Sequence, residues 1–178
     1  MFLSFSPASR LRYATVSIMF LDCNEIISGR LWVGCHIHPE DARLLRQMGI
    51  TSILNLQSDW DLATYNISIK KLTQAYFLAE IDLRRIPIPD FDRQSVGALL
   101  PQAVAELEDA LAPLRAKVYV HCTAGINRGP TLAAAYLIKA EGLTAQEAYN
   151  YVIVRRDCSP YLDTLQEYEA FLNRTRLV

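Results

Sequence analysis

The sequence predicts an α/β fold: a single domain with a mostly parallel central sheet flanked by helices. Short apolar runs typical of strands alternate with longer segments of helical periodicity along most of the 178 residues, the pattern of a parallel sheet with helical crossovers. Residues 117–121 lead into a tight turn and then an Ala-rich helix. Open sheets of this kind bind ligands beyond the carboxyl ends of central strands. A chain of this length can bury a sizeable core.

Composition argues against several classes of partner. Apolar residues make up 51% of the chain and the formal net charge is −1. There is therefore no bulk basic field for non-specific binding of nucleic acid or an anionic membrane. We expect neither as a partner, and we expect a monomer.

The cysteines indicate a reducing compartment rather than a disulfide framework. They are few, scattered and without a Cys-x-x-Cys pair: Cys23, Cys35, Cys122 and Cys158. His36 and His38 lie near one of them but have no second cluster of ligands, which favours a surface loop over a metal site. We expect no metal and no cofactor.

Residues 1–24 are expected to be a non-globular leader or upstream extension, and residues 25–178 the folded domain. Residues 13–21 form an apolar run with the length of a signal-peptide core, too short to span a bilayer. A transit peptide, a weak secretory signal and an extension upstream of a start at Met19 all fit this stretch. We expect a cytoplasmic protein, or a plastid one if residues 1–21 are a transit segment.

The first part of the domain is predicted to contain a strand, a helix and a second strand. Residues 30–35 are expected to form an edge strand. Residues 39–48 have Pro39 in the first turn and Gly49 as a stop, which predicts a helix. Residues 50–56 are rich in β-branched and apolar side chains and predict a buried strand.

The middle of the chain continues the alternation. Residues 57–66 are expected to form a loop, and the apolar spacing over residues 67–79 predicts a helix. Residues 83–88 predict a short strand, which Pro87 confines to a sheet edge or a strand end. Residues 89–94 follow as a loop.

Helices dominate the last part of the chain. Ser95 is expected to cap a helix over residues 96–111, and residues 117–121 to form the central strand. The Ala-rich helix after Pro130 should end at Gly142.

Two further elements complete the prediction. Thr144 and Glu147 form a capping-box pattern that opens the next helix. Residues 155–160 are expected to be a loop, and residues 161–174 a final amphipathic helix.

Cys122 and Arg128 form a Cys-x5-Arg pattern directly after the central strand. A loop closing onto a helix N-terminus points several backbone N–H groups at one spot within the positive field of the helix dipole, which suits a phosphate dianion. The guanidinium can bind two phosphate oxygens at once. The same field is expected to lower the pKa of Cys122, giving a thiolate that attacks phosphorus. The expected phosphate-binding loop is Thr123, Ala124, Gly125, Ile126, Asn127 and Arg128, with His121 in a supporting role.

The leaving alkoxide needs a proton, and an acid on a separate loop is the usual source. Asp90 and Asp92 are the candidates, in the sequence PDFD between a strand and a helix. We favour Asp90, whose approach is stiffened by the prolines before it. The alternative role for either carboxylate is to cap the helix that begins near Ser95.

HCTAGINR, residues 121–128, resembles the phosphate-binding loop of dual-specificity phosphatases. The wider pattern resembles the glucan phosphatases of the plant starch-excess and laforin type. The similar segments are LWVGCHIHPEDARLLRQMGITSILNLQSDWDL, PDFD with LLP at Leu99–Pro101, and RRDCSPYLDTL at residues 155–165. The resemblance covers roughly residues 26–172.

This resemblance implies a dual-specificity phosphatase-like fold and a metal-independent phosphatase that acts on phosphorylated glucan, a starch- or glycogen-like polymer. It also selects Asp90 as the acid, by its spacing from Cys122. The chain departs from the family pattern at three positions: Asn127, where Gly is usual, Gly129, where many members have Ser or Thr, and Ser159, where Phe is common.

Aromatic rings suit a glucan because a flat ring packs on the apolar face of a pyranose. Trp60, Tyr65 and Phe91 lie on predicted loops that would flank the pocket, and Tyr161 is a fourth candidate. The alternative is that these rings pack in the core or against loops.

Two other functions stay open, and a third is disfavoured by the loop. A phosphatase acting on phosphotyrosine and phosphoserine proteins would use the same loop. A lipid-directed phosphatase would be expected to carry extra basic residues between Cys122 and Arg128, and this chain has none there. An inactive scaffold that binds a phosphorylated ligand would retain the fold without turnover.

Overall fold

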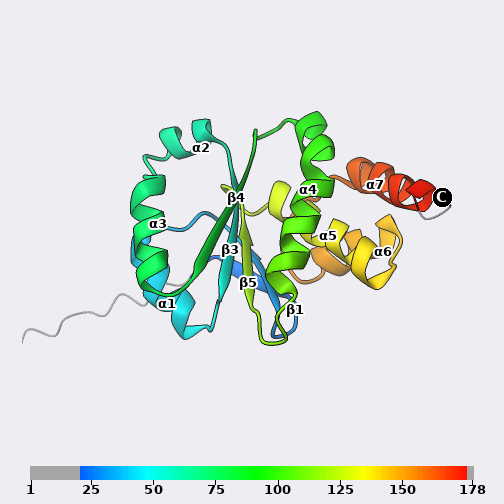
Figure 1. The fold of residues 1–178 in the computed structure, drawn as a ribbon. Coiled ribbons are helices and arrows are strands. Elements are labelled where there is room, and N and C mark those ends of the chain that lie inside the picture. The colour runs from blue at the N-terminus through cyan, green and yellow to red at the C-terminus, as the bar shows by residue number, and fades with distance from the viewer. Residues whose placement is uncertain (1–20, 176–178) are drawn as a thin grey trace, which may run out of the picture.

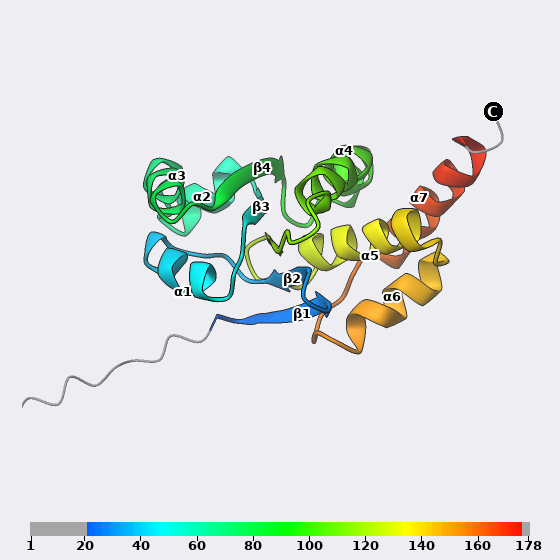
Figure 2. The same ribbon diagram turned by 60° about the horizontal axis from the view of Figure 1, so that its bottom comes forward.

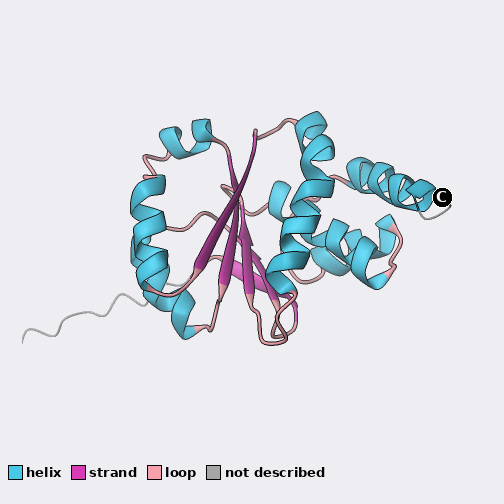
Figure 3. Cartoon of the chain, viewed as in Figure 1, coloured by secondary structure: helices cyan, strands magenta, loops and turns pink. Residues whose placement is uncertain are grey.

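The computed structural model describes residues 21–175 and shows a five-stranded sheet in the order β1-β2-β5-β3-β4 (Figures 1 and 3). The β1–β2 pair is antiparallel and the other three pairs are parallel. This confirms the predicted α/β fold with a mostly parallel sheet. The strands are β1 (Cys23–Ile27), β2 (Leu31–Gly34), β3 (Ser52–Gln57), β4 (Asp82–Ile88) and β5 (Val118–His121).

Helices cover both faces of the sheet. Helices α1, α2 and α3 lie on one face; α4 and α5 pack on the other, with α6 and α7 outside them (Figures 1 and 2). The helical elements are a 3-10 turn (Pro39–Asp41), α1 (Ala42–Gln47), α2 (Asp59–Thr64), α3 (Ile69–Leu78), α4 (Arg93–Leu111), α5 (Arg128–Glu141), α6 (Ala145–Ile153) and α7 (Leu162–Thr175).

The two faces have separate apolar cores. The larger core lies between the sheet and α4–α7, and the smaller one lies under α1 and α3. Every residue of β3 and β5 is buried, as expected for parallel strands covered on both sides. The central strand β5 is thus held rigidly, and the loop after it starts from a fixed point.

The strand expected over residues 30–35 is confirmed as β2, but its expected position at the sheet edge is wrong. Strand β2 lies between β1 and β5, and β1 forms the edge. Strand β1 escaped sequence reasoning because its residues Asn24 and Glu25 are polar and exposed. At the other edge lies β4, which contains Pro87 and occupies the position expected from that proline.

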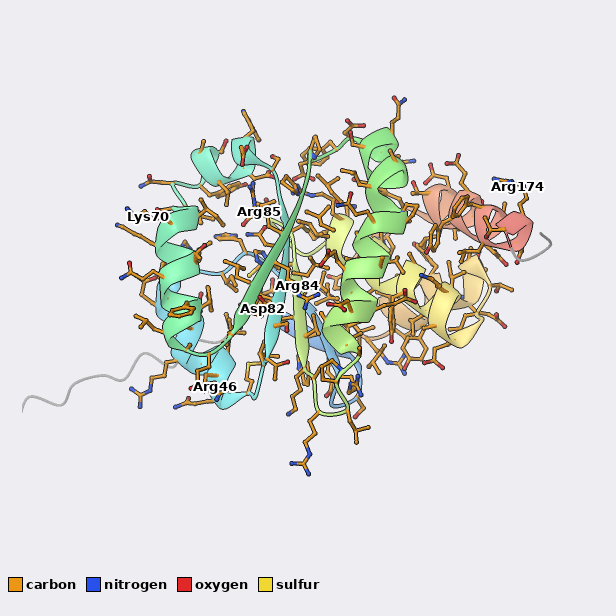
Figure 4. All side chains as sticks on the ribbon, viewed as in Figure 1. Arg46, Lys70, Asp82, Arg84, Arg85 and Arg174 are labelled. Atoms are coloured by element: carbon orange, nitrogen blue, oxygen red, sulfur yellow. The ribbon has the colours of Figure 1, made fainter. Side chains whose placement is uncertain are left out.

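The expected loop over residues 57–66 is also wrong, because it contains α2. Ser58 caps this helix: its Oγ accepts a hydrogen bond from the Asp61 N–H (3.1 Å), and the Asp61 carboxylate accepts one from the Ser58 N–H (2.8 Å). This reciprocal capping box satisfies donors that a short helix would otherwise leave unpaired. Arg85 of β4, labelled in Figure 4, donates to the Gln57 carbonyl (2.9 Å) and so holds the backbone just before α2.

Helix α4 begins earlier than predicted, and its cap is Asp92 rather than Ser95. The Asp92 carboxylate accepts hydrogen bonds from the N–H (3.0 Å) and the hydroxyl (2.6 Å) of Ser95. The later caps follow the prediction. Gly142 ends α5 with a φ of +70°, and Thr144 with Glu147 forms the capping box of α6.

The expected leader, residues 1–24, lies almost entirely outside the described residues. The first strand begins at Cys23, slightly before the boundary at residue 25 that we expected. Among the described helices, none combines the length and apolar character needed to cross a membrane.

Candidate active site

The loop between β5 and α5 is a cradle of backbone N–H groups. Within the described part of the chain, the N–H groups of residues 124–127 donate no hydrogen bond. A row of free N–H groups ahead of a helix is a site for an anion. The arrangement therefore suits the phosphate expected from the Cys-x5-Arg pattern.

Neighbouring segments hold the loop from outside by its carbonyl groups. The carbonyl of Thr123 accepts from the His36 N–H (2.9 Å), and that of Ile126 accepts from the Ser159 N–H (2.9 Å). The carbonyl of Gly125 accepts from Nε of Arg156 (2.7 Å), a side chain that is itself buried. With its carbonyls held outward, the loop keeps its N–H groups available.

Gly125 is required by space as well as by conformation. Its φ is +68°, and a Cβ atom there would lie 2.5 Å from the backbone of Gly34 at the end of β2. No larger residue fits such an approach. The conformation of the loop thus depends on close contact between two neighbouring strand ends.

Asn127 and Ser159, two of the three departures from the family pattern, contact each other. The Nδ2 of Asn127 donates to the carbonyl of Ser159 (2.8 Å). Asn127 has a negative φ of −113°, so its backbone does not need glycine. Its side chain ties the loop to the segment before α7.

Cys122 and His121 lie at the base of the loop, and both are buried. The Nδ1 of His121 is 3.1 Å from the carbonyl of Cys122; a carbonyl only accepts, so this nitrogen carries the hydrogen. Burial lowers the pKa of His121 to about 4. The imidazole is therefore neutral at physiological pH and supports the backbone of Cys122 without adding charge.

Arg128 is only 1% exposed, and nearly all its donors are engaged. Its Nη1 donates to the Asp61 carboxylate (2.7 Å) and the Ile88 carbonyl (2.7 Å). Its Nη2 lies 3.2 Å from the Thr123 hydroxyl and 2.9 Å from Asp90 Oδ2. Among the described residues Nε has no partner, so this N–H is left for a ligand.

Asp61 is a site residue that sequence reasoning missed. Burial opposes ionisation of both partners, but the contact with Arg128 and the hydrogen bonds from Ser58 outweigh it, so the pKa of Asp61 is lowered and that of Arg128 is raised. Both groups stay charged. The S-x-x-D capping pattern at Ser58 could have shown where Asp61 begins a helix, but nothing local indicated Arg128 as its partner.

The structure separates the two candidate acids. The Asp90 carboxylate lies against Arg128 and is partly exposed, whereas the Asp92 carboxylate caps α4. Phe91, between them, has a positive φ of 58°, an uncommon conformation for a bulky residue and one that clusters at functional sites. Phe91 thus separates a carboxylate that contacts Arg128 from one that caps α4.

Three of the four aromatic candidates are exposed: Trp60 by 70%, Tyr65 by 48% and Phe91 by 84%. The ring of Tyr65 lies 5.4 Å from that of His36, whose Nδ1 is 3.1 Å from the Thr123 carbonyl. Trp60 lies on α2 and Tyr65 directly follows it, not on the loop we expected.

Tyr161 differs from the other three, because it is only 8% exposed. The guanidinium of Arg93 lies 5.0 Å from its ring centre, and burial raises the pKa of its hydroxyl. Its ring is therefore largely covered, unlike the exposed rings of the other three candidates.

Comparison with known proteins gives one family and several relatives. The family model described as dual specificity phosphatase, catalytic domain, matches residues 31–171. A phosphoglucan phosphatase from Castanea sativa (DSP4, amyloplastic) is 34% identical over 76% of this chain and 36% of its own length. The dual specificity protein phosphatase Mpk3 of Drosophila melanogaster is 30% identical over 86% of this chain and 34% of its own. The chain thus spans only about a third of the length of these relatives.

Solved structures share the fold. A human tyrosine phosphatase-like serine/threonine/tyrosine-interacting protein superposes with a TM-score of 0.70 at 24% identity, over 86% of this chain and 99% of the other. The PTP-2 phosphatase of Cydia pomonella superposes with a TM-score of 0.69 at 20% identity, over 83% and 90% of the two chains.

Proposed function

The chain belongs to the dual specificity phosphatase family, and from this premise we propose that it hydrolyses phosphomonoesters through a phosphocysteine at Cys122. The observation that supports this most is the set of free donors at one place: the loop N–H groups of residues 124–127 and Nε of Arg128. These donors match the charge and the several acceptor oxygens of a phosphate group.

The reaction has two steps. In the first, Sγ of Cys122 attacks phosphorus, the P–S bond forms, and the bond to the ester oxygen breaks while Asp90 protonates the leaving alkoxide. In the second, Asp90 accepts a proton from water as that water attacks phosphorus, and phosphate and the thiolate are released. Arg128 and the loop N–H groups stabilise the charge on the transferring group throughout.

Binding of phosphate rearranges the contact between Asp90 and Arg128. A guanidinium has five N–H donors, of which Nη1 and Nη2 engage Asp61, Ile88, Thr123 and Asp90. A phosphate held by Nε and Nη2 together takes the place of the Asp90 carboxylate. Asp90 is then released next to the leaving oxygen, where it takes up a proton from solvent and serves as the acid.

We propose phosphorylated glucan as the substrate. Trp60, Tyr65 and Phe91 give exposed rings on segments that reach the loop, and the Castanea sativa relative is a phosphoglucan phosphatase by name. A phosphoprotein substrate is the second candidate, favoured by the likeness to protein phosphatases such as Mpk3. We further propose a cytoplasmic monomer without bound metal, with a plastid as the alternative compartment.

Substitution of the exposed rings tests the substrate. Tyr65→Ala and Phe91→Ala should reduce phosphate release from solubilised amylopectin by about tenfold, because each loses packing on a sugar face. Turnover of a small aryl phosphate should stay within about twofold of wild type. Phe77→Ala is the matched control, because Phe77 is 78% exposed on α3. Equal losses on both substrates would exclude the glucan platform.

The catalytic role of Cys122 has a separate test. Cys122→Ser should abolish turnover of the aryl phosphate, because an alcohol at this position is a far weaker nucleophile than a thiolate. The variant should still bind inorganic phosphate, which isothermal calorimetry measures. If wild-type protein turns over no faster than Cys122→Ser, the chain is a binding scaffold and the enzyme proposal fails.

A further inference from the structure

The guanidinium of Arg128 has one acceptor on Nη2 that stays in place during the proposed reaction. The Asp61 carboxylate and the Ile88 carbonyl fix the position of Nη1. Because both acceptors contact the same nitrogen, the guanidinium plane can still tilt about it. The other acceptor on Nη2 is the Asp90 carboxylate, which phosphate displaces in the proposed reaction. The Thr123 hydroxyl, 3.2 Å away, is the remaining acceptor.

Thr123 is itself held firmly. Its side chain is buried, and its carbonyl accepts from the His36 backbone. Its Oγ1 also lies 3.4 Å from Nε2 of Gln57. A hydroxyl oxygen can accept two hydrogen bonds and donate one, so one oxygen can serve Gln57 and Arg128 together.

Gln57 is the buried end of this chain of contacts. It is the last residue of β3 and is 0% exposed. Its backbone N–H donates to Asn55 Oδ1 (2.7 Å) and its carbonyl accepts from Arg85. With its backbone fixed on both sides, the side chain points at the loop.

The amide of Gln57 is only half satisfied, because among the described residues its Oε1 has no partner. Buried side-chain polar atoms are usually paired, so an amide here costs stability that an apolar side chain would not. The oxygen and nitrogen of an amide can be exchanged without changing its shape. In the exchanged orientation the Thr123 hydroxyl donates to Gln57 and still accepts from Arg128, so the connection holds either way.

We propose that Gln57 and Thr123 are positioning residues for Arg128. Gln57 holds the Thr123 hydroxyl, and the hydroxyl holds Nη2, so that Nε and the hydrogen of Nη2 released by Asp90 both face the phosphate. This inference rests on the proposed function, since it takes Arg128 as the phosphate-binding group.

Two substitutions of Thr123 separate the hydroxyl from the space it fills. Thr123→Val keeps the shape and removes the hydroxyl, and should lower kcat/KM for an aryl phosphate by about tenfold and weaken inhibition by inorganic phosphate to a similar degree. Thr123→Ser keeps the hydroxyl and should stay within about threefold of wild type. Thr164→Val, a buried threonine on α7, controls for loss of a buried hydroxyl elsewhere and should be unaffected.

A double-mutant cycle tests whether Gln57 acts through Thr123. Gln57→Leu should lower kcat/KM several-fold in the wild-type background and have little further effect in Thr123→Val, because the acceptor it orients is then absent. Thermal unfolding of each variant reports on folding. Should Gln57→Leu fail to fold, the two Thr123 variants still decide the role of the hydroxyl.

The inference is overturned if Thr123→Val matches wild type, if Thr123→Ser is as impaired as Thr123→Val, or if the Gln57 and Thr123 effects multiply independently. In each case an inactive Cys122→Ser would leave the proposed function intact. Activity retained by Cys122→Ser would instead remove the proposed function, whatever the result at Thr123.

Discussion

Asp90 and Asp92 belong to one short loop, yet their carboxylates have different partners. Asp92 accepts both hydrogen bonds of Ser95 at the start of α4, and hydrogen bonds from Ser95 hold its pKa below the ordinary value. This carboxylate is occupied as the cap of the helix. Asp90 faces Arg128 instead and is tied to no helix terminus. The positive φ of Phe91 between them produces this division.

Substitution at the two positions should therefore have different effects. Asp90→Asn should lower kcat for an alkyl phosphate by about a hundredfold, because the poor leaving group loses its acid, and should lower kcat less for an aryl phosphate. Asp92→Ala should lower the Tm through loss of the cap while leaving kcat close to wild type. Steady-state kinetics and thermal unfolding measure both. The reverse pattern would assign the acid to Asp92.

At the scale of elements, α2 joins the proposed glucan-binding surface to the proposed phosphate site. One carboxylate oxygen of Asp61 accepts from the Ser58 N–H, the Ser58 hydroxyl and Nη1 of Arg128. The same group therefore starts the helix that carries Trp60 and orients the guanidinium. A shift of α2 would change both the aromatic surface and the phosphate site.

Asp61→Asn should be costly for both reasons. It leaves Arg128 buried without its main charge partner, and breaking such a pair costs about 3–5 kcal/mol. We expect a loss of this order in the free energy of unfolding, measured by urea denaturation, together with a large fall in kcat/KM. Asp59→Asn is the control on the same helix: Asp59 pairs with Arg85 at the surface, so it should change stability by less than about 1 kcal/mol.

Sequence periodicity captured the elements whose pattern is strong and local. The helices α4 to α7 and the strands β3 and β5 follow from apolar spacing and from caps such as Thr144 and Gly142. Strand β1 was missed because an edge strand buries too little to show an apolar pattern, and α2 because the length of a short helix is set by its cap rather than by periodicity.

In the candidate site too, the part that is contiguous in sequence is predictable and the part assembled from distant elements is not. The Cys122 to Arg128 loop is contiguous in the chain, so its motif is visible in the sequence. The contacts that orient it come from Asp61, Gln57 and Arg156, which lie on other elements and approach only when the sheet forms. Sequence order alone carries no information on which carboxylate or amide will meet a given guanidinium.

At the scale of the whole molecule, stability is linked to pH through the buried His121. Burial lowers its pKa from an ordinary value of about 6.5 to about 4 in the folded state. Between these values the unfolded chain binds more protons, so stability increases with pH across this range and is lost as pH falls.

The free energy of unfolding should therefore drop by about 3 kcal/mol between pH 6.5 and pH 4 from this group alone. Asp61, whose pKa is lowered by Arg128 and Ser58, adds a further loss at lower pH. Urea denaturation of wild type and His121→Gln across this range measures the effect. An equal slope in both proteins would show that His121 does not carry it.

The edge strand β1 determines where the domain can be truncated at its N-terminal side. The family match begins at residue 31, but Arg156, which holds the Gly125 carbonyl, is itself anchored by Asp22 and Asn24 beside and within β1. Expression trimmed to the matched region would remove these anchors and leave the backbone of β2 open to pairing with other copies. Such a fragment should aggregate and lose phosphate affinity together, although every residue from Cys122 to Arg128 is still present.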